Sequence, residues 1–208
     1  MNFYVINLKE RTDRLEKIKS LYPDFNLIPI EAVKHINGDV GCFLSHKKCI
    51  QYAKDNKMKN IIVLEDDCCP LENFTEKIKE IYEFLNNYKN WDIFLGGAFC
   101  ITPHNIEGKI QVGKDFIYKT NSGFCTHFII YNESSYDFFL NLDETKCPID
   151  NAWQGKLRCY ITIPFIASQF TSFSNISNVE QSSFPKKIRI NNYRLCKIFD
   201  ASAKELGV

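Results

Sequence analysis

"IIVLEDDCCP", residues 61–70, places four apolar residues directly before three consecutive acids. A continuous apolar run of this kind is typical of a strand that is buried on both faces of a parallel sheet. Open α/β sheets bind ligands beyond the carboxyl ends of their strands, and Glu65, Asp66 and Asp67 follow this strand directly. The stretch therefore predicts both a fold class and the place of a site, with a solvated acidic turn as the alternative.

Strand and helix patterns alternate on both sides of this stretch as far as residue 97. The expected strands are 3–8, 27–33 (weakened by Pro29), 60–66 and 92–97. The expected helices are one that opens with a capping box at Asp13 and Glu16, then 42–56 after a turn at 37–41, and 74–88. This alternation predicts a doubly wound α/β fold whose central, mostly parallel sheet is flanked by helices.

The pattern changes after residue 100, where strands are expected at 116–120, 125–131 and 159–169 and a helix at 132–142. We expect one domain with a nucleotide-binding half (about 1–100), an acceptor and donor-sugar half (about 101–180) and a basic helical tail (181–208). The tail is interpreted as a solvated surface helix. An anionic acceptor or a membrane surface is the alternative partner for it.

Composition narrows the class of protein. The chain has 208 residues, 45% of them hydrophobic, which suits one domain with a substantial core. A net charge of +1 argues against a nucleic-acid partner, which would need a strongly basic face. The N-terminus lacks a signal-peptide pattern, and no run approaches the roughly 18 apolar residues of a membrane helix. We therefore expect no integral membrane segment and a cytoplasmic location, or the host cytoplasm for a viral chain.

The nine cysteines are odd in number and scattered among apolar neighbours, Cys42, Cys49, Cys100 and Cys125 among them. This usage is typical of reduced core cysteines in an intracellular protein. The adjacent pair Cys68–Cys69 has no matching CxxC motif and predicts no zinc site there.

The three acids predict a metal site. If residues 65–67 stay extended, Glu65 and Asp67 point to one side and Asp66 to the other. Converging carboxylates repel each other unless a cation joins them. Oxygen ligands suit Mg²⁺ or Mn²⁺, which complete their coordination shell with phosphate oxygens and water.

Two further features are compatible with a phosphate-containing ligand. Arg11 and Arg14 lie at the start of a helix, where the backbone already favours anions, although surface salt bridges are the alternative. Ser45 and His46 open another helix behind a glycine turn, where capping or packing is the alternative role.

Six blocks occur together in one order and carry a family resemblance. They are "VINLKERTDR" (5–14), "GDVGCFLSHKKCI" (38–50), "VLEDD" (63–67), "DIFLGG" (92–97), "THFIIYNESSYDFFL" (126–140) and "PIDNAW" (148–153). From about residue 3 to about residue 176 the chain resembles glycosyltransferase family 25, the lipooligosaccharide and procollagen galactosyltransferases. The resemblance implies a GT-A-like (Rossmann-type) fold and transfer of a hexose from a UDP-sugar with inversion.

The resemblance also implies residue roles in the nucleotide half. Within the acidic motif Glu65-Asp66-Asp67, Asp67 is the first choice as ligand of Mn²⁺ (or Mg²⁺), with Glu65 near the ribose or the metal. Asn7, Arg11 and Arg14 would line the nucleotide pocket, with Ser45 and His46 close by.

In the second half, Asp150 matches the family's acidic position and is the expected catalytic base, with a helix cap as its alternative role. Gly96 and Gly97 would allow close approach of a sugar, and Ser122, Gly123 and His127 would lie near it, although His127 also fits a core position. Trp153, Phe165 and Phe170 could stack on a sugar acceptor, but core packing is the preferred interpretation.

The expected function is metal-dependent transfer of galactose or glucose from a UDP-sugar to a hydroxyl of a saccharide or hydroxylysine acceptor. Two alternatives stay open: an inactive nucleotide-sugar-binding module and a metal-dependent UDP-sugar hydrolase. Because the chain is short for a GT-A enzyme, acceptor loops could come from a partner subunit, and a homodimer is a possible assembly.

Overall fold

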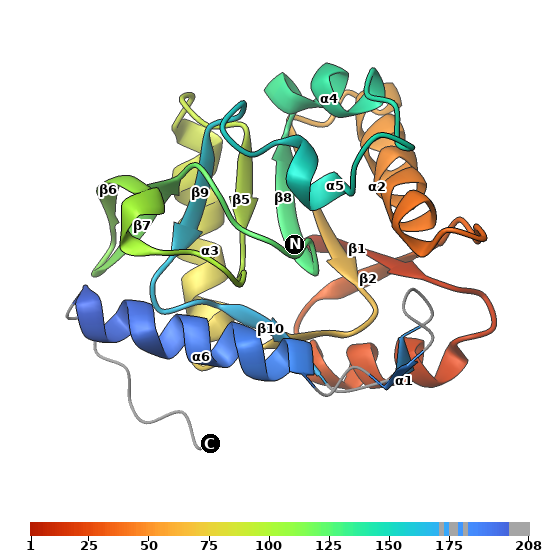
Figure 1. Ribbon diagram of the computed structural model, residues 1–208, viewed down its shortest axis with the longest axis horizontal. Coiled ribbons are helices and arrows are strands. Elements are labelled where there is room, and N and C mark those ends of the chain that lie inside the picture. Colours follow the sequence, from red (N-terminus) through yellow and green to blue (C-terminus); the bar gives the residue numbers. More distant parts are fainter. Residues whose placement is uncertain (171–172, 175–178, 181–182, 200–208) are drawn as a thin grey trace.

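An eight-stranded mixed sheet in the order β2-β1-β3-β8-β5-β9-β7-β6 forms the centre of the molecule (Figure 1). The computed structural model describes residues 1–170, 173–174, 179–180 and 183–199. The strands of this sheet are β1 (Asn2–Asn7), β2 (Asn26–Glu31), β3 (Asn60–Glu65), β5 (Ile93–Leu95), β6 (Ile106–Val112), β7 (Asp115–Thr120), β8 (Phe128–Asn132) and β9 (Cys159–Thr162). Two small two-stranded sheets pair β4 (Cys68–Pro70) with β10 (Ala167–Gln169), and β11 (Phe173–Ser174) with β12 (Val179–Glu180).

Helices pack on both faces of the central sheet. They are α1 (Thr12–Leu21), α2 (Gly38–Asp55), α3 (Phe74–Asn87), α4 (Glu133–Leu140), the short α5 (Ile149–Ala152) and α6 (Ser183–Ile198). The predicted α/β fold is confirmed, because β1 pairs in parallel with β2 and β3, and β5 with β9. The simple alternation is interrupted by β8, which inserts antiparallel between β3 and β5.

The opening stretch forms β3, and its apolar residues serve both faces of the sheet. Ile61 and Val63 belong to the core cluster that includes α2 and α4. Ile62 and Leu64 belong to the opposite cluster, which includes α1 and α3. Since alternate residues of a strand point to opposite faces, both sets must be apolar when both faces are covered.

Several element boundaries differ from the prediction. The expected turn at 37–41 is the first turn of α2, because the Asn37 side chain accepts hydrogen bonds from the backbone amides of Asp39 and Val40. The expected capping box at Asp13 is absent: α1 is capped by Arg11 without a side-chain hydrogen bond. The expected strand 159–169 is two strands, β9 and β10, that lie in different sheets.

The Cys68–Cys69 pair lies in β4, where it pairs with the end of β10. Cys68 is fully buried and its Sγ lies 3.2 Å from the Tyr22 hydroxyl oxygen at hydrogen-bonding distance. Gln169 lies opposite Cys68 in this antiparallel pair. The double cysteine is therefore a structural strand that joins the acidic turn to the end of β10.

The basic tail is a helix, as predicted, but it is not only a surface helix. α6 contacts β10 along its length (Figure 1), and Ile188, Leu195 and Cys196 are buried. The Asn192 side-chain oxygen accepts a hydrogen bond from the Phe165 amide. The rest of the predicted tail, residues 181–182 and 200–208, lies outside the described residues.

The nine cysteines are all free thiols. Cys100 is exposed, contrary to its expected core position, whereas Cys49 is buried and Cys42 and Cys125 are partly buried. None of the described helices combines the length and apolar composition that a bilayer-spanning segment requires.

Gly97 is expected to be required for folding. A Cβ at this position would lie 2.2 Å from the carbonyl oxygen of Ala167, where the backbones of β5 and β10 approach each other. Gly97→Ala should therefore lower the free energy of unfolding by about 3 kcal/mol or more, the upper range for overpacking. Gly108→Ala is the matched control, because a Cβ there would meet nothing within 4 Å. Equal denaturant midpoints for the two variants would contradict this expectation.

Candidate active site

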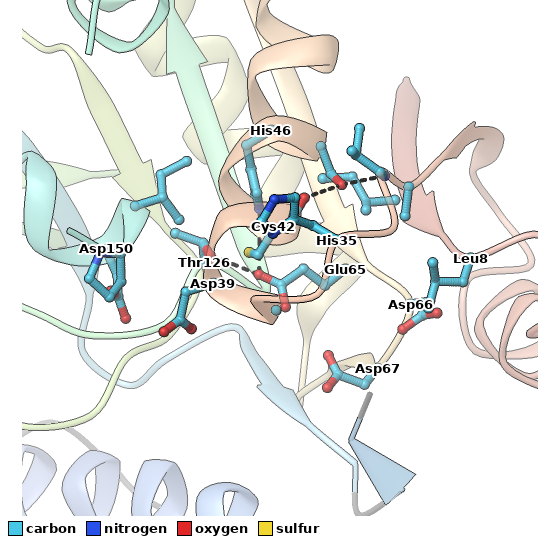
Figure 2. Close-up of a pocket in the computed structure, with 18 of the residues that line it drawn as sticks. Leu8, His35, Asp39, Cys42, His46, Glu65, Asp66, Asp67, Thr126 and Asp150 are labelled. Carbon is cyan, nitrogen blue, oxygen red and sulfur yellow. Dashed lines mark hydrogen bonds and ion pairs between the residues drawn. The ribbon is translucent and has the colours of Figure 1, made fainter. Parts of the chain in front are cut away.

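A cavity of about 440 Å³ opens beyond the carboxyl ends of β1 and β3, between the N-terminal ends of α2 and α5 (Figure 2). This is the place that the opening stretch predicted. Its wall contains five acids and few cations. The polar and charged residues that line it are Arg14, Lys34, His35, Asp39, Cys42, Ser45, His46, Glu65, Asp66, Asp67, Cys125, Thr126, Asp150 and Gln169.

Each acid of the motif has its own partner. Glu65 accepts a 2.7 Å hydrogen bond from the Thr126 hydroxyl. Asp66 pairs with Arg14 at 2.5 Å, and the Asp67 carboxylate accepts the Gln169 amide at 3.2 and 3.3 Å. The condition of an extended chain over residues 65–67 is not met: the chain turns at residues 66–67, so Asp66 does not face away and all three acids line the cavity.

The electrostatic state of these acids is unusual for neutral pH. Burial, together with repulsion from Glu65 and Asp66, raises the pKa of Asp67 to about 7. Burial also raises the pKa of Asp66, although Arg14 partly opposes this. For Glu65 burial acts in the same direction, but His46 and Thr126 outweigh it and leave the pKa below its ordinary value. A cation in the cavity would relieve the repulsion.

Asp150 lies on the opposite side of the cavity from Asp66 and Asp67 (Figure 2). It occupies the first turn of α5, one residue after Ile149, and Pro148 is the N-cap of this helix. Its carboxylate accepts a 3.2 Å hydrogen bond from the Cys125 amide, and burial raises its pKa. The Asp150 carboxylate is therefore held by the Cys125 amide, and its side chain also lines the cavity.

Only one of the two arginines predicted to bind the nucleotide lines the cavity. Arg14 lines the cavity, where Asp66 holds it. Arg11 lies outside the lining and its guanidinium forks onto Asp13, at 2.9 and 2.8 Å. Asn7 is buried between the lining residues Ile6 and Leu8, and its amide nitrogen donates to the Leu8 carbonyl.

Ser45 and His46 both line the cavity from α2. The Ser45 hydroxyl donates to the Gly41 carbonyl and accepts from the Val33 amide, so it fixes the loop that leads into the helix. His46 is fully buried and hydrogen-bonds through Nδ1 to the Tyr131 hydroxyl. Ser45 thus shapes the cavity wall, and His46 presents a ring nitrogen near Glu65.

The residues expected near the donor sugar are not among those that line the cavity. Gly97 packs against the Ala167 carbonyl. The Ser122 hydroxyl donates to the Gln154 side chain, and the Gln154 amide donates to the Gly123 carbonyl, so this loop is held from the turn that follows α5. Its later residues, Cys125 and Thr126, reach the cavity.

His127, Trp153 and Phe165 belong to the interior, whereas Phe170 is only partly buried. His127 is fully buried, and burial lowers its pKa to about 4. Trp153 and Phe165 are buried core residues, as preferred from the sequence. Phe170 packs under the Lys17 ammonium group, 3.7 Å from the ring centre.

Several lining residues were not predicted from sequence. Asp39 and Cys42 lie inside the "GDVGCFLSHKKCI" block, from which only Ser45 and His46 were selected, so a signal was present. Lys34 and His35 follow the second strand without any recognisable pattern. Gln169 is 102 residues from Asp67 in the sequence, and only the β4–β10 pair brings the two together.

The mixed α/β sheet and its acidic cavity at the strand ends define a GT-A-like fold. The family described as glycosyltransferase family 25 (LPS biosynthesis protein) matches residues 30–146, more than half of the chain. The chain belongs to glycosyltransferase family 25, and glycosyl transfer is the general activity that this membership indicates. Asn7, Arg11, Arg14 and Asp150 lie outside the matched residues.

Solved structures with a similar fold are distant. A197 from STIV is 12% identical, with 88% of this chain and 94% of that chain covered and a TM-score of 0.45. A glycosyltransferase involved in the glycosylation of the major capsid of PBCV-1 is 15% identical, with 66% and 62% covered and a TM-score of 0.41. Mouse xyloside xylosyltransferase 1 is also 15% identical, with 69% and 59% covered and a TM-score of 0.35. Likenesses at these scores say nothing about substrate or mechanism, and no curated protein matches the sequence.

Proposed function

We propose that this chain transfers a hexose, galactose or glucose, from a UDP-sugar to a hydroxyl of a saccharide or hydroxylysine acceptor, with inversion. The observation that carries the proposal is the placement of two sets of acids around one cavity. Asp66 and Asp67 lie at one side and Asp150 at the other, with Glu65 between them. An inverting transfer needs the groups that stabilise the leaving group and the base that activates the acceptor to lie apart, because the leaving group and the acceptor lie on opposite faces of the sugar.

The donor set fits a hard divalent cation, Mn²⁺ or Mg²⁺. Asp67 and Glu65 would hold it, because both carboxylates line the cavity and because burial, together with repulsion from Glu65 and Asp66, destabilises the ionised form of Asp67. When bound, such an ion neutralises charge on the departing diphosphate, which is worth several kcal/mol. The Gln169 amide would orient the Asp67 carboxylate.

The other residues of this half would bind the nucleotide. Arg14 and Lys34 are the cationic side chains suited to the diphosphate, since both line the cavity. Asp66 keeps the Arg14 guanidinium in place through its 2.5 Å ion pair. Asn7 and Arg11 stay proposed nucleotide neighbours at the end of β1.

Asp150 would accept the proton of the acceptor hydroxyl. Its raised pKa makes it a stronger base than an exposed aspartate, and the Cys125 amide fixes the carboxylate. Ser122 and Gly123 would support the sugar side indirectly, because Gln154 ties their loop to the helix that carries Asp150.

Release of UDP from a panel of UDP-hexoses, measured with Mn²⁺ and with EDTA, tests the proposal. Release should require the metal, should be raised by a suitable acceptor, and should fall by at least about 100-fold in Asp67→Asn, as loss of several kcal/mol at the leaving group implies. The Asp24→Asn variant is the control, because Asp24 is an exposed acid outside the cavity.

The same experiment separates the alternatives. Full-rate UDP release that no acceptor raises would identify a UDP-sugar hydrolase. UDP binding without release from any donor would identify a binding module and overturn the proposed transfer.

A further inference from the structure

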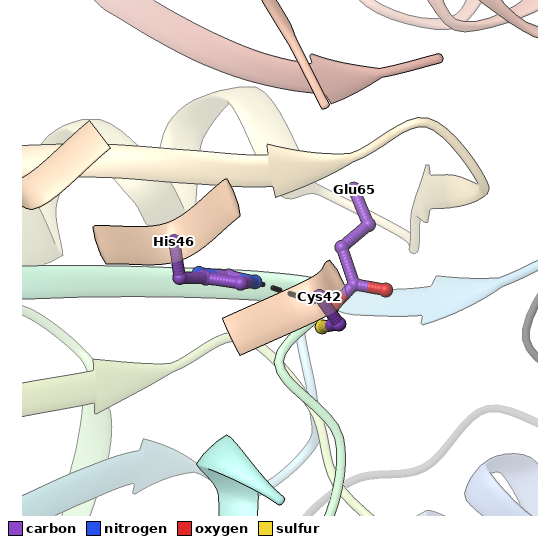
Figure 3. A group of neighbouring side chains, drawn as sticks. All are labelled: Cys42, His46 and Glu65. Atoms are coloured by element: carbon purple, nitrogen blue, oxygen red, sulfur yellow. Dashed lines mark ion pairs between the residues drawn. The ribbon is translucent and has the colours of Figure 1, made fainter. Parts of the chain in front are cut away.

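Cys42, His46 and Glu65 meet at the inner wall of the cavity (Figure 3). The Cys42 sulfur, a ring nitrogen of His46 and a carboxylate oxygen of Glu65 lie within 4.8 Å of one another. Cys42 and His46 are four residues apart on α2, so both project from the same face of the helix. Glu65 approaches them from the end of β3.

His46 is arranged as a metal ligand would be. Its Nδ1 hydrogen-bonds to the Tyr131 hydroxyl at 2.9 Å, which fixes the orientation of the ring. Its Nε2 is buried and, within the part of the chain that the structure describes, has no hydrogen-bond partner. This nitrogen lies 3.5 Å from the Glu65 carboxylate. Apart from this ion-pair contact, a buried ring nitrogen that makes no hydrogen bond is uncommon and is suited to hold a water or an ion.

Glu65 is positioned by a contact of its own. The Thr126 hydroxyl donates a 2.7 Å hydrogen bond to the same carboxylate oxygen that faces His46. Tyr131 therefore orients His46, and Thr126 orients Glu65. Hydrogen bonds of this kind orient the ligands of metal sites in general. Both contacts exist without any ion, so the two donors are already oriented.

The chemistry of the three donors selects the metal. Sulfur, imidazole and carboxylate together suit Zn²⁺, whereas Mg²⁺ and Mn²⁺ favour oxygen alone. Tetrahedral zinc places its ligand atoms about 3.4–3.7 Å apart, given bonds of about 2.0–2.3 Å. The His46–Glu65 distance of 3.5 Å already matches, and the Cys42 sulfur would need a small movement.

We infer that Cys42, His46 and Glu65 form a zinc-binding site that shares Glu65 with the oxygen-only site proposed at Asp67 and differs from it in its sulfur and imidazole donors. Three protein ligands leave a fourth position open to the cavity, which water would fill. Binding replaces the thiol proton of Cys42, which passes to solvent. The inference does not depend on the proposed transfer, because it concerns these three side chains and their affinity for a metal.

Two binding measurements on the full chain test the site. Metal-free protein titrated with Co²⁺ should develop sulfur-to-cobalt charge-transfer absorption that saturates at one ion per chain, and Zn²⁺ should then remove it. Calorimetric titration with Zn²⁺ should give the same stoichiometry. Absence of the charge-transfer band, or of Zn²⁺ binding, would overturn the inference without bearing on UDP release.

Matched variants locate the ion. Thr126→Val should lower Zn²⁺ affinity by about 10- to 100-fold, the usual effect of losing a residue that supports a metal ligand. Cys42→Ser removes a ligand itself and should lower the affinity by more than about 100-fold. Cys125→Ser is the control, because Cys125 lines the same cavity outside the three-donor group. Circular dichroism checks that each variant is folded. The Co²⁺ titration uses the unaltered chain, so it tests the site even if a variant does not fold. Zn²⁺ binding that survives Cys42→Ser but is lost in Asp67→Asn would place the ion at the acidic motif and contradict the site.

Discussion

Replacing Asp67 by Asn should stabilise the metal-free protein at neutral pH. In the folded state the pKa of Asp67 is about 7, against an ordinary value of 3.8. The folded state therefore holds a proton that the unfolded state has lost between these values, and the free energy of unfolding falls as pH rises through this range. The asparagine cannot ionise and does not incur this loss. The gap of about 3 pH units sets a ceiling of about 4 kcal/mol on the gain above pH 7.

Urea unfolding at pH 5 and pH 8, with EDTA present, measures this effect. The stability gain of Asp67→Asn over the unaltered chain should be about 1.6 kcal/mol at pH 5 and should approach the ceiling of about 4 kcal/mol at pH 8. Saturating Mn²⁺ should narrow this difference, because an ion at 100 times its Kd stabilises the unaltered chain by about 2.7 kcal/mol and the variant much less.

Asp92→Asn is the matched control and should have the opposite sign. Asp92 is also buried, but the Arg158 guanidinium and the Ser134 hydroxyl outweigh the effect of burial and hold its pKa below the ordinary value. Its loss should cost about 2 kcal/mol or more at pH 8, as for hydrogen bonds to a charged group. If both variants were destabilised equally, mutual repulsion at the acidic motif would be refuted.

Replacing Asp150 by Asn should remove acceptor-dependent transfer. A positioned base typically contributes a factor of about 10²–10⁴, which is about 3–5 kcal/mol. Because burial raises the pKa of Asp150, the rate of the unaltered enzyme should rise as pH rises through that pKa, and the variant should lose this dependence. Single-turnover rates across a pH series, with donor and acceptor saturating, provide the measurement.

Asp39→Asn is the control for this loss, because Asp39 lines the same cavity near the start of α2 and has no proposed role in proton transfer. Its rate should stay within about fivefold of the unaltered enzyme, the effect expected of a charge near a helix terminus. A similar fall in both variants would show that Asp150 acts through the charge of the cavity and not as a base.

Local sequence was sufficient to place the site but not to orient its side chains. The apolar run and the acids of 61–67 are contiguous, so the strand and its carboxyl end could be predicted together. The direction of Asp66 depended on where the strand stopped, and the chain turns one residue earlier than the extended geometry assumes. A period-two argument fails where the strand ends, because the turn changes the direction of each side chain.

Long-range pairing explains the remaining differences. The antiparallel insertion of β8 between β3 and β5 leaves no local pattern, because its residues Phe128–Tyr131 are as apolar as those of a parallel strand. The packing role of Gly97 depends on Ala167, which is distant in the sequence. Contacts of this kind are set by the tertiary fold, and single-sequence patterns do not contain them.

The pairing of β4 with β10 has a consequence for the order of assembly during synthesis. Gln169, which holds the Asp67 carboxylate, leaves the ribosome about 100 residues after that acid, and domains acquire their distant contacts only once the participating segments exist. A nascent chain that ends before β10 has the acidic motif but lacks one of its supports. The complete arrangement around the acidic motif is therefore a late product of folding, and the N-terminal half alone cannot supply it.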